Sequence, residues 1–411
     1  MSIITIMSGA YCNSETVIQK CAAQTGFRRI DDPMIVAEAA RISGISDRKI
    51  QGAFSAKTSI FNQFTHEKER SIAYLRLVLA GMLDADDLII DGVSGLLIPD
   101  TISHVLRVCI IADMKYRLLA AQQQEKVSEK EAAALIRRQD ENIAAWTGAV
   151  RGATDPWEPA LYDIMIPTDK ISDSEAVALI TQHAASEVVR RTGRSRQAVS
   201  DFQLAARAGE ALANAGHNVA TSAKNATVRI TINKHVMLLS RLEEELKEIV
   251  MKISGVAAVE TGVGENFHQP DIYRKYDFQM PAKILLVDDE REFVQTLSER
   301  LIMRDMGSAV AYDGESALSM VDEEEPEVMI LDLKMPGIDG IEVLRKVKQT
   351  RPDIEVIILT GHGSEADRQI CMELGAFAYL HKPVDIDVLS KTLKAANEKV
   401  QKKGDRLKAE G

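Results

Sequence analysis

The chain of 411 residues is short of several features that would each define a class of protein. Its four cysteines are scattered along the chain without a CxxC pair, which argues against a disulfide framework or a cysteine-ligated zinc site. No apolar run approaches the roughly 18 residues needed to span a bilayer. The N-terminus lacks a basic region before a long apolar core, so we expect no signal peptide. We therefore expect a cytoplasmic protein with reduced thiols and no transmembrane segment.

Positive charge is also scarce. With 50 Lys and Arg against 61 Asp and Glu, the net charge is −11, which gives no basic field for nucleic acid. No basic helix-turn-helix segment is present, so we expect no DNA binding. The sequence also lacks the dimerisation region and the ATP-binding set of a histidine kinase. Its 45% hydrophobic and 27% charged residues are ordinary for a globular protein, and its length indicates two to four domains.

In the last third of the chain, four short apolar runs each end in a polar group. Strands of a parallel sheet have this pattern, and ligand sites lie outside their carboxyl ends. The four runs, each with the residues that follow it, are Lys283–Val287 with Asp288, Asp289 and Glu290; Val328–Leu331 with Asp332; Val356–Leu359 with Thr360; and Phe377–Leu380 with His381, Lys382 and Pro383.

Asp332 is the natural phosphate acceptor of such a site. A carboxylate is a poor nucleophile toward a phosphoryl group, because both carry negative charge. A divalent metal that bridges their oxygens removes the repulsion. Asp288 and Asp289 follow one strand and Asp332 ends another, so three carboxylates can converge on one Mg²⁺.

Lys382 can reach the same pocket and pair with the phosphoryl oxygens, and the following Pro383 suggests a rigid turn with a cis peptide bond. Thr360 can offer its hydroxyl to the phosphate. If Thr360 moves inward, Tyr379 on the neighbouring strand is the side chain that can fill the vacated space. The sequence thus predicts a switch in which phosphorylation biases a two-state element.

Residues 283 to 396 resemble the receiver domain of bacterial two-component response regulators, with Asp288, Asp289, Asp332, Thr360 and Lys382 at its signature positions. The resemblance implies a flavodoxin-like (βα)5 fold and phosphotransfer from a histidine kinase to Asp332. It also implies Mg²⁺ held by Asp289, Asp332 and the backbone carbonyl of Lys334, with Asp288 acting through water.

Residues 1 to about 190 alternate strand-like runs with helical stretches, which indicates an α/β layer fold. It resembles the cytidylate kinase-like proteins, which implies a P-loop nucleoside monophosphate kinase-like fold. The matching segments are 87–92, 106–112, Arg117, 137–140 and 161–168. The loop after the first strand departs from the family: Ser14 stands for its second glycine and Glu15 for its lysine. Val93 and Asn142 replace two arginines.

A carboxylate at position 15 would repel phosphate by roughly 4 kcal/mol at about 4 Å, so we interpret residues 1–190 as a degenerate kinase domain. We expect it to bind a nucleotide or a protein partner without turnover. Four arginines could line an anion pocket or could be ordinary helix-surface residues, and both interpretations remain open. They are Arg107, Arg117, Arg137 and Arg138.

The middle segment has the order α-β-β-α-β, with Thr227–Ile232 and His235–Leu239 as its first two strands. It resembles a BON-type module. A spacer and a dimerising module are the alternatives, and the second would make the chain a homodimer. The expected domains are therefore 1–190; a small α+β module at 198–266; a linker at 267–281, preceded by a first linker at 192–196; a receiver at 282–398; and a basic tail at 399–411, read as a fraying helix.

Together these features predict a phosphorelay signalling protein in which phosphorylation of Asp332 switches the interactions of the upstream domains. The alternative is a receiver-regulated nucleoside monophosphate kinase, and the degenerate loop favours the first reading.

Overall fold

A computed structural model describes residues 2–57, 59–236, 238–264, 267, 283–304, 306–361 and 363–409. The chain forms two compact units. The first comprises Met1–Thr58 and Glu67–Tyr273, and the second comprises Ser59–His66 and Arg274–Gly411. In the described part of the chain, no helix is both long and apolar enough to cross a membrane.

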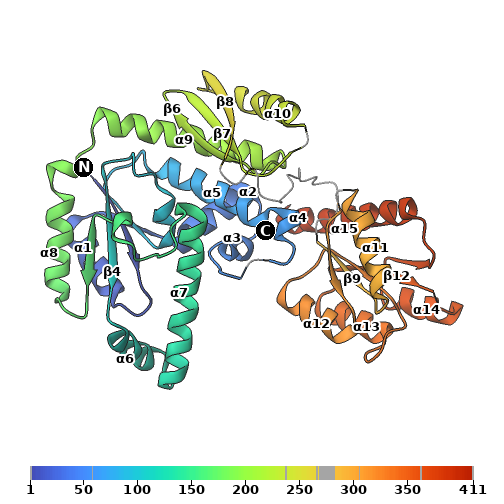
Figure 1. The fold of residues 1–411 in the computed structure, drawn as a ribbon. Coiled ribbons are helices and arrows are strands. Elements are labelled where there is room, and N and C mark those ends of the chain that lie inside the picture. The colour runs from blue at the N-terminus through green and yellow to red at the C-terminus, as the bar shows by residue number, and fades with distance from the viewer. Residues whose placement is uncertain are drawn as a thin grey trace. The chain divides into compact units, whose positions relative to one another are not determined.

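The first unit contains a five-stranded parallel sheet in the order β2-β3-β1-β4-β5 (Figure 1). Its strands are β1 (Ile3–Ser8), β2 (Arg28–Asp31), β3 (Leu88–Asp91), β4 (Val105–Ile111) and β5 (Ile164–Pro167). Both faces are covered, which is why the strands read as nearly continuous apolar runs. Ile3 packs on one side against α2 (Asp32–Ser43) and α5 (Glu67–Met82). Ile4 and Ile6 pack on the other side against α1 (Ser14–Thr25) and α8 (Asp173–Ala184).

The remaining elements of this part connect the strands. Ser128 and Glu131 form a capping box that begins the long helix α7. Ser172 and Glu175 do the same for α8. The other elements are α3 (Asp47–Gly52), η1 (Val93–Leu97), α6 (Met114–Glu125), α7 (Glu129–Arg151), η2 (Pro159–Leu161) and η3 (Glu187–Val189).

Residues 192–196, expected to be a linker, instead begin helix α9 (Gly193–Asn214), with Thr192 accepting a hydrogen bond from the Ser195 N–H at its start. Helix α9 is apolar on two faces. Phe202 and its neighbours join the core of the parallel sheet, whereas Leu204 and Leu212 join the core of the following small sheet. A polar, basic first turn at the surface explains why the sequence looked like a connector.

The small sheet has the order β6-β7-β8, from Ala220–Lys224, Thr227–Ile232 and Ala258–Val263. Strands β6 and β7 form an antiparallel hairpin, and β8 pairs parallel to β7. Helix α10 (Leu239–Met251) packs against the sheet. The predicted order α-β-β-α-β is present, but the strand expected at His235–Leu239 was wrong. The hairpin partner is β6, whose Ala, Thr, Ser and Lys residues lack an apolar signal.

The second unit contains another five-stranded parallel sheet, in the order β10-β9-β11-β12-β13, which is the flavodoxin-like order that the sequence predicted. Its strands are β9 (Ile284–Val287), β10 (Ser308–Ala311), β11 (Val328–Leu331), β12 (Glu355–Thr360) and β13 (Ala378–His381). Strand β10 escaped prediction because its four residues, Ser-Ala-Val-Ala, are small and only weakly apolar.

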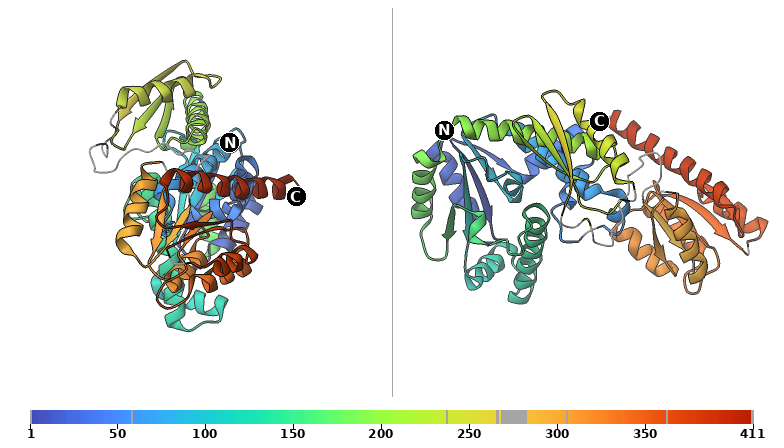
Figure 2. Two further views of the ribbon diagram at one scale, coloured as in Figure 1. Left: turned by 90° about the vertical axis from the view of Figure 1, so that its right-hand side faces the viewer. Right: turned by 45° about the horizontal axis from the view of Figure 1, so that its top comes forward.

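Helices cover both faces of this second sheet. Leu285 and Val287 face α12 (Gly314–Glu323), α13 (Gly340–Thr350) and α14 (Glu365–Glu373). Ile284 and Leu286 face α11 (Arg291–Ile302) and α15 (Ile386–Ala409). The unit also includes the short helix α4 (Asn62–Thr65). Figure 2 shows α15 as the long red helix at the end of the chain.

The sequence predicted a linker at 267–281 and a basic tail at 399–411. Apart from Phe267, the expected linker 267–281 lies outside the described residues. The expected basic tail is the continuation of α15, which runs to Ala409. Its first residue, Lys399, pairs with the fully buried carboxylate of Glu355 at 2.9 Å, so that residue is part of the packed unit.

Candidate functional site: an acidic cluster at the carboxyl edge of the second sheet

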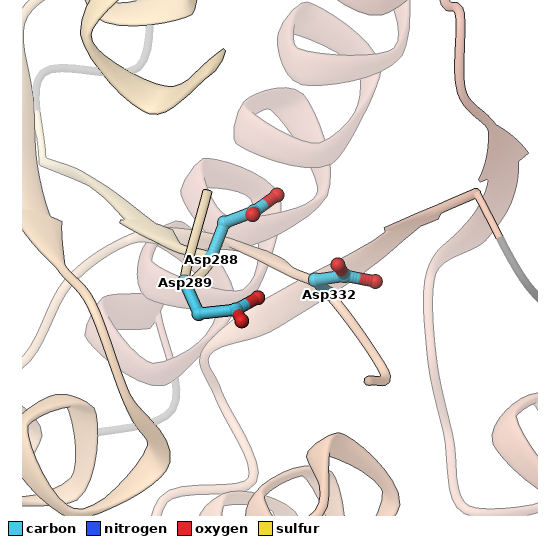
Figure 3. A group of neighbouring side chains, drawn as sticks. All are labelled: Asp288, Asp289 and Asp332. Carbon is cyan, nitrogen blue, oxygen red and sulfur yellow. The ribbon is translucent and has the colours of Figure 1, made fainter. Parts of the chain in front are cut away.

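Three carboxylates meet where β9 and β11 end. Asp288 and Asp289 follow β9, and Asp332 follows the neighbouring strand β11 (Figure 3). One carboxylate oxygen from each residue lies within 4.8 Å of the others. Asp288 and Asp332 are each only 5% exposed, whereas Asp289 is exposed. The structure thus brings together the three carboxylates that the sequence placed at this sheet edge, and their role as metal ligands remains a prediction.

Lys382 lies in the same cluster. Its Nζ is 2.6 Å from Asp288 Oδ2, 3.1 Å from Asp332 Oδ2 and 3.1 Å from Glu290 Oε1. The Lys382–Pro383 peptide bond is cis, as its sequence suggested. Glu290 was given no role from sequence, because the third acidic residue of Asp288-Asp289-Glu290 begins the turn into a helix and could as well have been a solvated charge.

Burial and pairing act in opposite directions on these groups. Burial would lower the pKa of Lys382, but the hydrogen bond to Asp288 and the surrounding carboxylates raise it to about 12. Burial raises the pKa of Asp288, and the hydrogen bond from Lys382 only partly opposes this. Lys382 is therefore a firmly protonated cation, and it offsets a cluster that would otherwise repel itself.

The donor set fits a hard divalent cation. Mg²⁺ prefers oxygen ligands and is usually bound by one or two carboxylates together with water and phosphate. The Asp332 Oδ1 atom accepts a hydrogen bond from the Leu333 N–H at 2.7 Å, which fixes the orientation of that carboxylate. Lys334, the expected carbonyl ligand, is exposed in the loop directly after β11, and its role remains a prediction.

Gly340 holds this loop close to the strand end. Its N–H donates to the Leu333 carbonyl at 3.0 Å, and a Cβ at this position would overlap the backbone of Asp332 and Leu333. No local sequence pattern reveals this close backbone contact.

Thr360 and Tyr379 lie on adjacent strands, β12 and β13, with Thr360 fully buried. The Tyr379 hydroxyl is also buried, and it has no hydrogen-bond partner among the described residues. A Cβ at Gly363 would overlap that hydroxyl and would lie close to the methyl group of Thr360. The tyrosine thus points inward beneath Gly363. Sequence reasoning named the pair but missed Gly363, whose lack of a side chain makes the room.

In the first unit, the loop after β1 carries a carboxylate where a phosphate-binding loop carries a lysine. Glu15 accepts two hydrogen bonds from Arg29, each 2.7 Å long, and Arg29 also pairs with Asp91. The hydrogen bonds from Arg29 have the largest effect on the pKa of Glu15, and they lower it. The nearby positive charge of Arg29 is therefore already shared between two acidic side chains.

Of the four arginines considered as anion ligands, two are held by internal contacts. Arg117 forms a bidentate pair with Asp140, with distances of 2.6 and 3.0 Å, and donates to the Ala10 carbonyl at 2.8 Å. Arg107 donates to the carbonyls of Val105 and Pro99. Arg137 and Arg138 are exposed on α7. Arg107 and Arg117 are therefore engaged by internal partners, and the role of all four as anion ligands remains a prediction.

A cavity of about 500 Å³ lies beside the β3–η1 connection of this unit. Among the described residues, its polar lining contains no lysine or arginine and consists of two carboxylates, three amides and one hydroxyl: Asp32, Asp47, Gln51, Gln139, Asn142 and Ser55. Burial raises the pKa of Asp32, which accepts hydrogen bonds from the N–H groups of Val93 and Ser94. Such a lining is poorly suited to a phosphate group.

Comparisons with known proteins match two separate parts of the chain to two different families. Residues 284–394 match the model of the response regulator receiver domain, and residues 3–170 match that of the cytidylate kinase-like family. The second unit therefore contains a receiver domain, and the parallel α/β part of the first unit is related to the cytidylate kinase-like proteins. Both resemblances noted in the sequence are supported. The BON-type resemblance of the middle segment is not shown by these comparisons and remains a prediction.

Similar curated proteins include response regulators that match about a quarter of this chain. The transcriptional regulatory protein CpxR of Escherichia coli (strain K12) is 46% identical over 101 residues, covering 25% of this chain and 43% of CpxR. Response regulator MprA of Mycolicibacterium vanbaalenii is 34% identical over 116 residues, covering 28% of this chain and 50% of MprA. The chain thus spans half or less of the length of these relatives. A solved receiver domain protein from Clostridium thermocellum is 35% identical, with 29% of this chain and 96% of that chain covered and a TM-score of 0.28.

Proposed function

We propose that this chain is a phosphorelay signalling protein in which Asp332 accepts a phosphoryl group from a histidine kinase. The observation that carries the proposal is the convergence of Asp288, Asp289 and Asp332 with Lys382 at one sheet edge, within a domain that is homologous to response regulator receivers.

In this reaction a carboxylate oxygen of Asp332 forms a bond to phosphorus as the bond between phosphorus and the donor imidazole nitrogen breaks. Asp289, Asp332 and the Lys334 carbonyl would hold Mg²⁺, with Asp288 acting through water, and the metal would supply positive charge to the transferred group. Lys382 contributes a fixed positive charge beside the acceptor. Its protonated state is secured by the raised pKa of about 12.

The added phosphate carries a charge of about −1.5 to −2 and three acceptor oxygens. Thr360, at the end of the adjacent strand, is the hydroxyl that we assign to the phosphate, and Tyr379 is the side chain that responds. The inward position of Tyr379 against Gly363 and Thr360 supports this pairing, because the three groups occupy one confined space.

The upstream kinase-like domain is then the output, binding a nucleotide or a protein partner without turnover. The contact between Glu15 and Arg29 and the acidic lining of the 500 Å³ cavity argue against phosphoryl transfer by this domain. The cytoplasmic location, the homodimer and the BON-type role of the middle segment remain predictions.

Incubation of the full-length chain with Mg²⁺ and acetyl phosphate, followed by intact mass spectrometry, tests the acceptor. The expected result is one added phosphoryl group on the wild type and none on Asp332→Asn. Asp313→Asn is the matched control. Asp313 caps α12, and Asn serves equally well as a helix cap, so this variant should be phosphorylated as the wild type is. Equal phosphorylation of Asp332→Asn would overturn the assignment.

A kinase assay tests the alternative reading. We expect neither phosphorylation of CMP nor appreciable ATP hydrolysis by the full-length chain, with or without acetyl phosphate. Robust turnover that is lost in Arg137→Gln or Arg138→Gln would favour a receiver-regulated nucleoside monophosphate kinase instead.

A further inference from the structure

A second cavity in the first unit, with a volume of about 940 Å³, lies between the parallel sheet's helices and the small three-stranded sheet. Residues of α5, η1 and α7 form one side, and residues of α9 and β6 form the other; these elements can be followed in Figure 1. The loop after β1 does not line it. This cavity is therefore separate from both the acidic cluster and the kinase-like loop.

Arg76, on α5, lines this cavity with an unsatisfied group. Its Nε atom is buried and has no hydrogen-bond partner among the described residues, and no ion pair of Arg76 is found there. Burial lowers the pKa of its guanidinium. A buried polar group without a partner is costly, and a buried charge is more so unless a counter-charge approaches it. The missing partner of Arg76 would be an acceptor, preferably an anion.

Most of the other charged side chains around the cavity are also basic. Its lining includes four basic side chains, those of Arg76, Arg151, Arg194 and Lys224, and one acidic side chain, that of Asp201. Arg151 is paired with Asp100. Asp201 already accepts hydrogen bonds from the Gln197 side chain and from the Asn225 N–H. The balance favours an anion over a cation or a neutral polar ligand.

Apolar side chains form much of the remaining wall. Leu96, Leu97 and Phe202 are all less than 9% exposed, and they lie on the two opposing sides of the cavity. Ligand pockets of about 300–1,000 Å³ are typical of small-molecule sites, which combine a mostly apolar lining with a few polar groups that fix orientation. A bare inorganic ion would leave most of this volume and its apolar wall unused.

We propose that this cavity binds a small organic anion whose carboxylate or phosphate group pairs with Arg76 and whose apolar body packs against Leu96, Leu97 and Phe202. The ligand contacts α5 and α9 together, and so it bridges the parallel sheet's helices and the small sheet. This proposal does not depend on the phosphorelay assignment of the second unit.

Binding is tested on the full-length chain by calorimetry and by thermal denaturation with four probes. Phenylacetate and phenyl phosphate combine an anion with an apolar ring, phenylacetamide is the neutral analogue, and inorganic phosphate lacks the ring. A ligand that binds the folded state raises the unfolding temperature in a concentration-dependent way. We expect one or both aromatic anions to do so, with little effect of the neutral amide or of inorganic phosphate. Which anion binds more tightly distinguishes a carboxylate from a phosphate ligand.

Arg76→Met removes the charge and keeps much of the side-chain length. We expect it to fold and to bind the anion at least about tenfold more weakly, because hydrogen bonds to charged groups are among the stronger ones. Arg41→Met is the matched control. Arg41 is exposed on α2, pairs with Glu38 and does not line the cavity. Its anion affinity should equal that of the wild type.

If Arg76→Met does not fold, Lys224→Gln provides the second variant, since Lys224 lines the cavity from the exposed strand β6. It should weaken anion binding by a smaller factor. The proposal is overturned if neither aromatic anion binds the wild type, if the neutral amide binds equally well, or if the cavity variants retain wild-type affinity.

Discussion

The ammonium group of Lys382 lies closer to Asp288 than to the proposed phosphate acceptor. Its Nζ is 2.6 Å from Asp288 Oδ2 and 3.1 Å from Asp332 Oδ2. In the absence of other cations, Lys382 is thus the counter-charge of the whole acidic cluster. A divalent cation and a phosphoryl group would change this arrangement, because the first supplies positive charge to the carboxylates and the second gives Lys382 a new anion to pair with.

Replacing Lys382 should therefore make the second unit depend on metal. In Lys382→Met the carboxylates of Asp288 and Asp332 lose their nearest cation, and we expect the free energy of unfolding to fall by about 1–3 kcal/mol in EDTA. Mg²⁺ should restore more stability to this variant than it adds to the wild type. Urea denaturation with EDTA and with Mg²⁺ measures both effects.

Lys391→Met is the control for that comparison, since Lys391 is exposed on α15 outside the cluster. It should respond to Mg²⁺ as the wild type does. An identical metal response in all three proteins would mean that Lys382 does not compensate the acidic cluster.

The buried hydroxyl of Tyr379 gives a second prediction. Because it has no hydrogen-bond partner among the described residues, Tyr379→Phe removes an unsatisfied polar group and should raise the free energy of unfolding by about 1 kcal/mol. Gly363→Ala should act in the opposite direction, since its methyl group would overlap that hydroxyl. Urea denaturation of the two single variants and the double variant measures the coupling, and the alanine should cost less stability when position 379 is Phe.

Tyr312→Phe is the matched control, because Tyr312 lies outside this space and stacks with Arg291, 4.6 Å from the ring centroid. Its effect with Gly363→Ala should be additive. Additivity in the Tyr379 pair as well would contradict the contact between Gly363 and the tyrosine.

Most of the receiver could be predicted from sequence because its signals are local. Each of four strands is a short apolar run, and each functional group follows directly at its end, so sheet topology alone brings Asp288, Asp332, Thr360 and Lys382 together. Strand β10 and the roles of Gly340 and Gly363 could not be predicted in this way. They depend on which backbone or side chain from elsewhere comes close, and no local pattern encodes that.

The first unit was harder for a related reason. Arg117 and Asp140 are 23 residues apart, and their bidentate pair forms only because α6 and α7 pack together. From sequence, Arg117 could be an anion ligand or a surface arginine; in the structure it is buried and its guanidinium is paired with Asp140. The sequence placed a linker at 192–196, where helix α9 in fact begins. The first turn of α9 is polar, and the apolar residues that pack into two hydrophobic cores come later in the helix.

The capping boxes of the first unit predict a defined pH dependence. The pKa of Glu175 is lowered, first by the hydrogen bond from the Ser172 backbone N–H and then by the Ser172 hydroxyl. Because the pKa of Glu175 is lower in the folded state, its charge stabilises the fold. This stabilisation is complete above the unfolded-state pKa of about 4.3 and is lost as the pH falls through the folded-state pKa. Glu175→Gln keeps a capping side chain without a charge, so its stability relative to the wild type should improve on acidification.

Denaturation midpoints of the wild type and Glu175→Gln between neutral pH and the onset of acid unfolding measure this difference. Glu158→Gln, at an exposed position outside any capping box, serves as the control. A difference between Glu175→Gln and the wild type that does not vary with pH would contradict the role of the Glu175 charge.

The Arg117–Asp140 pair leads to the last prediction, which concerns the kinase-like loop itself. Arg117 also donates to the Ala10 carbonyl, so it joins the loop after β1 to α6 and α7. We expect Arg117→Met to lower the free energy of unfolding by about 1–3 kcal/mol, because Asp140 and the carbonyl both lose their donor. Arg117→Lys should recover only part of this, since a lysine cannot form the bidentate pair. Asp140→Asn combined with Arg117→Met should cost much less than the sum of the single changes, and urea denaturation of the four proteins gives this coupling energy. Arg138→Gln, at an exposed position on α7, should change stability by less than about 0.5 kcal/mol.

The opposite result would be that Arg117→Met leaves the free energy of unfolding unchanged and abolishes binding of a nucleotide. Arg117 would then be an anion ligand, and the loop after β1 would bind phosphate.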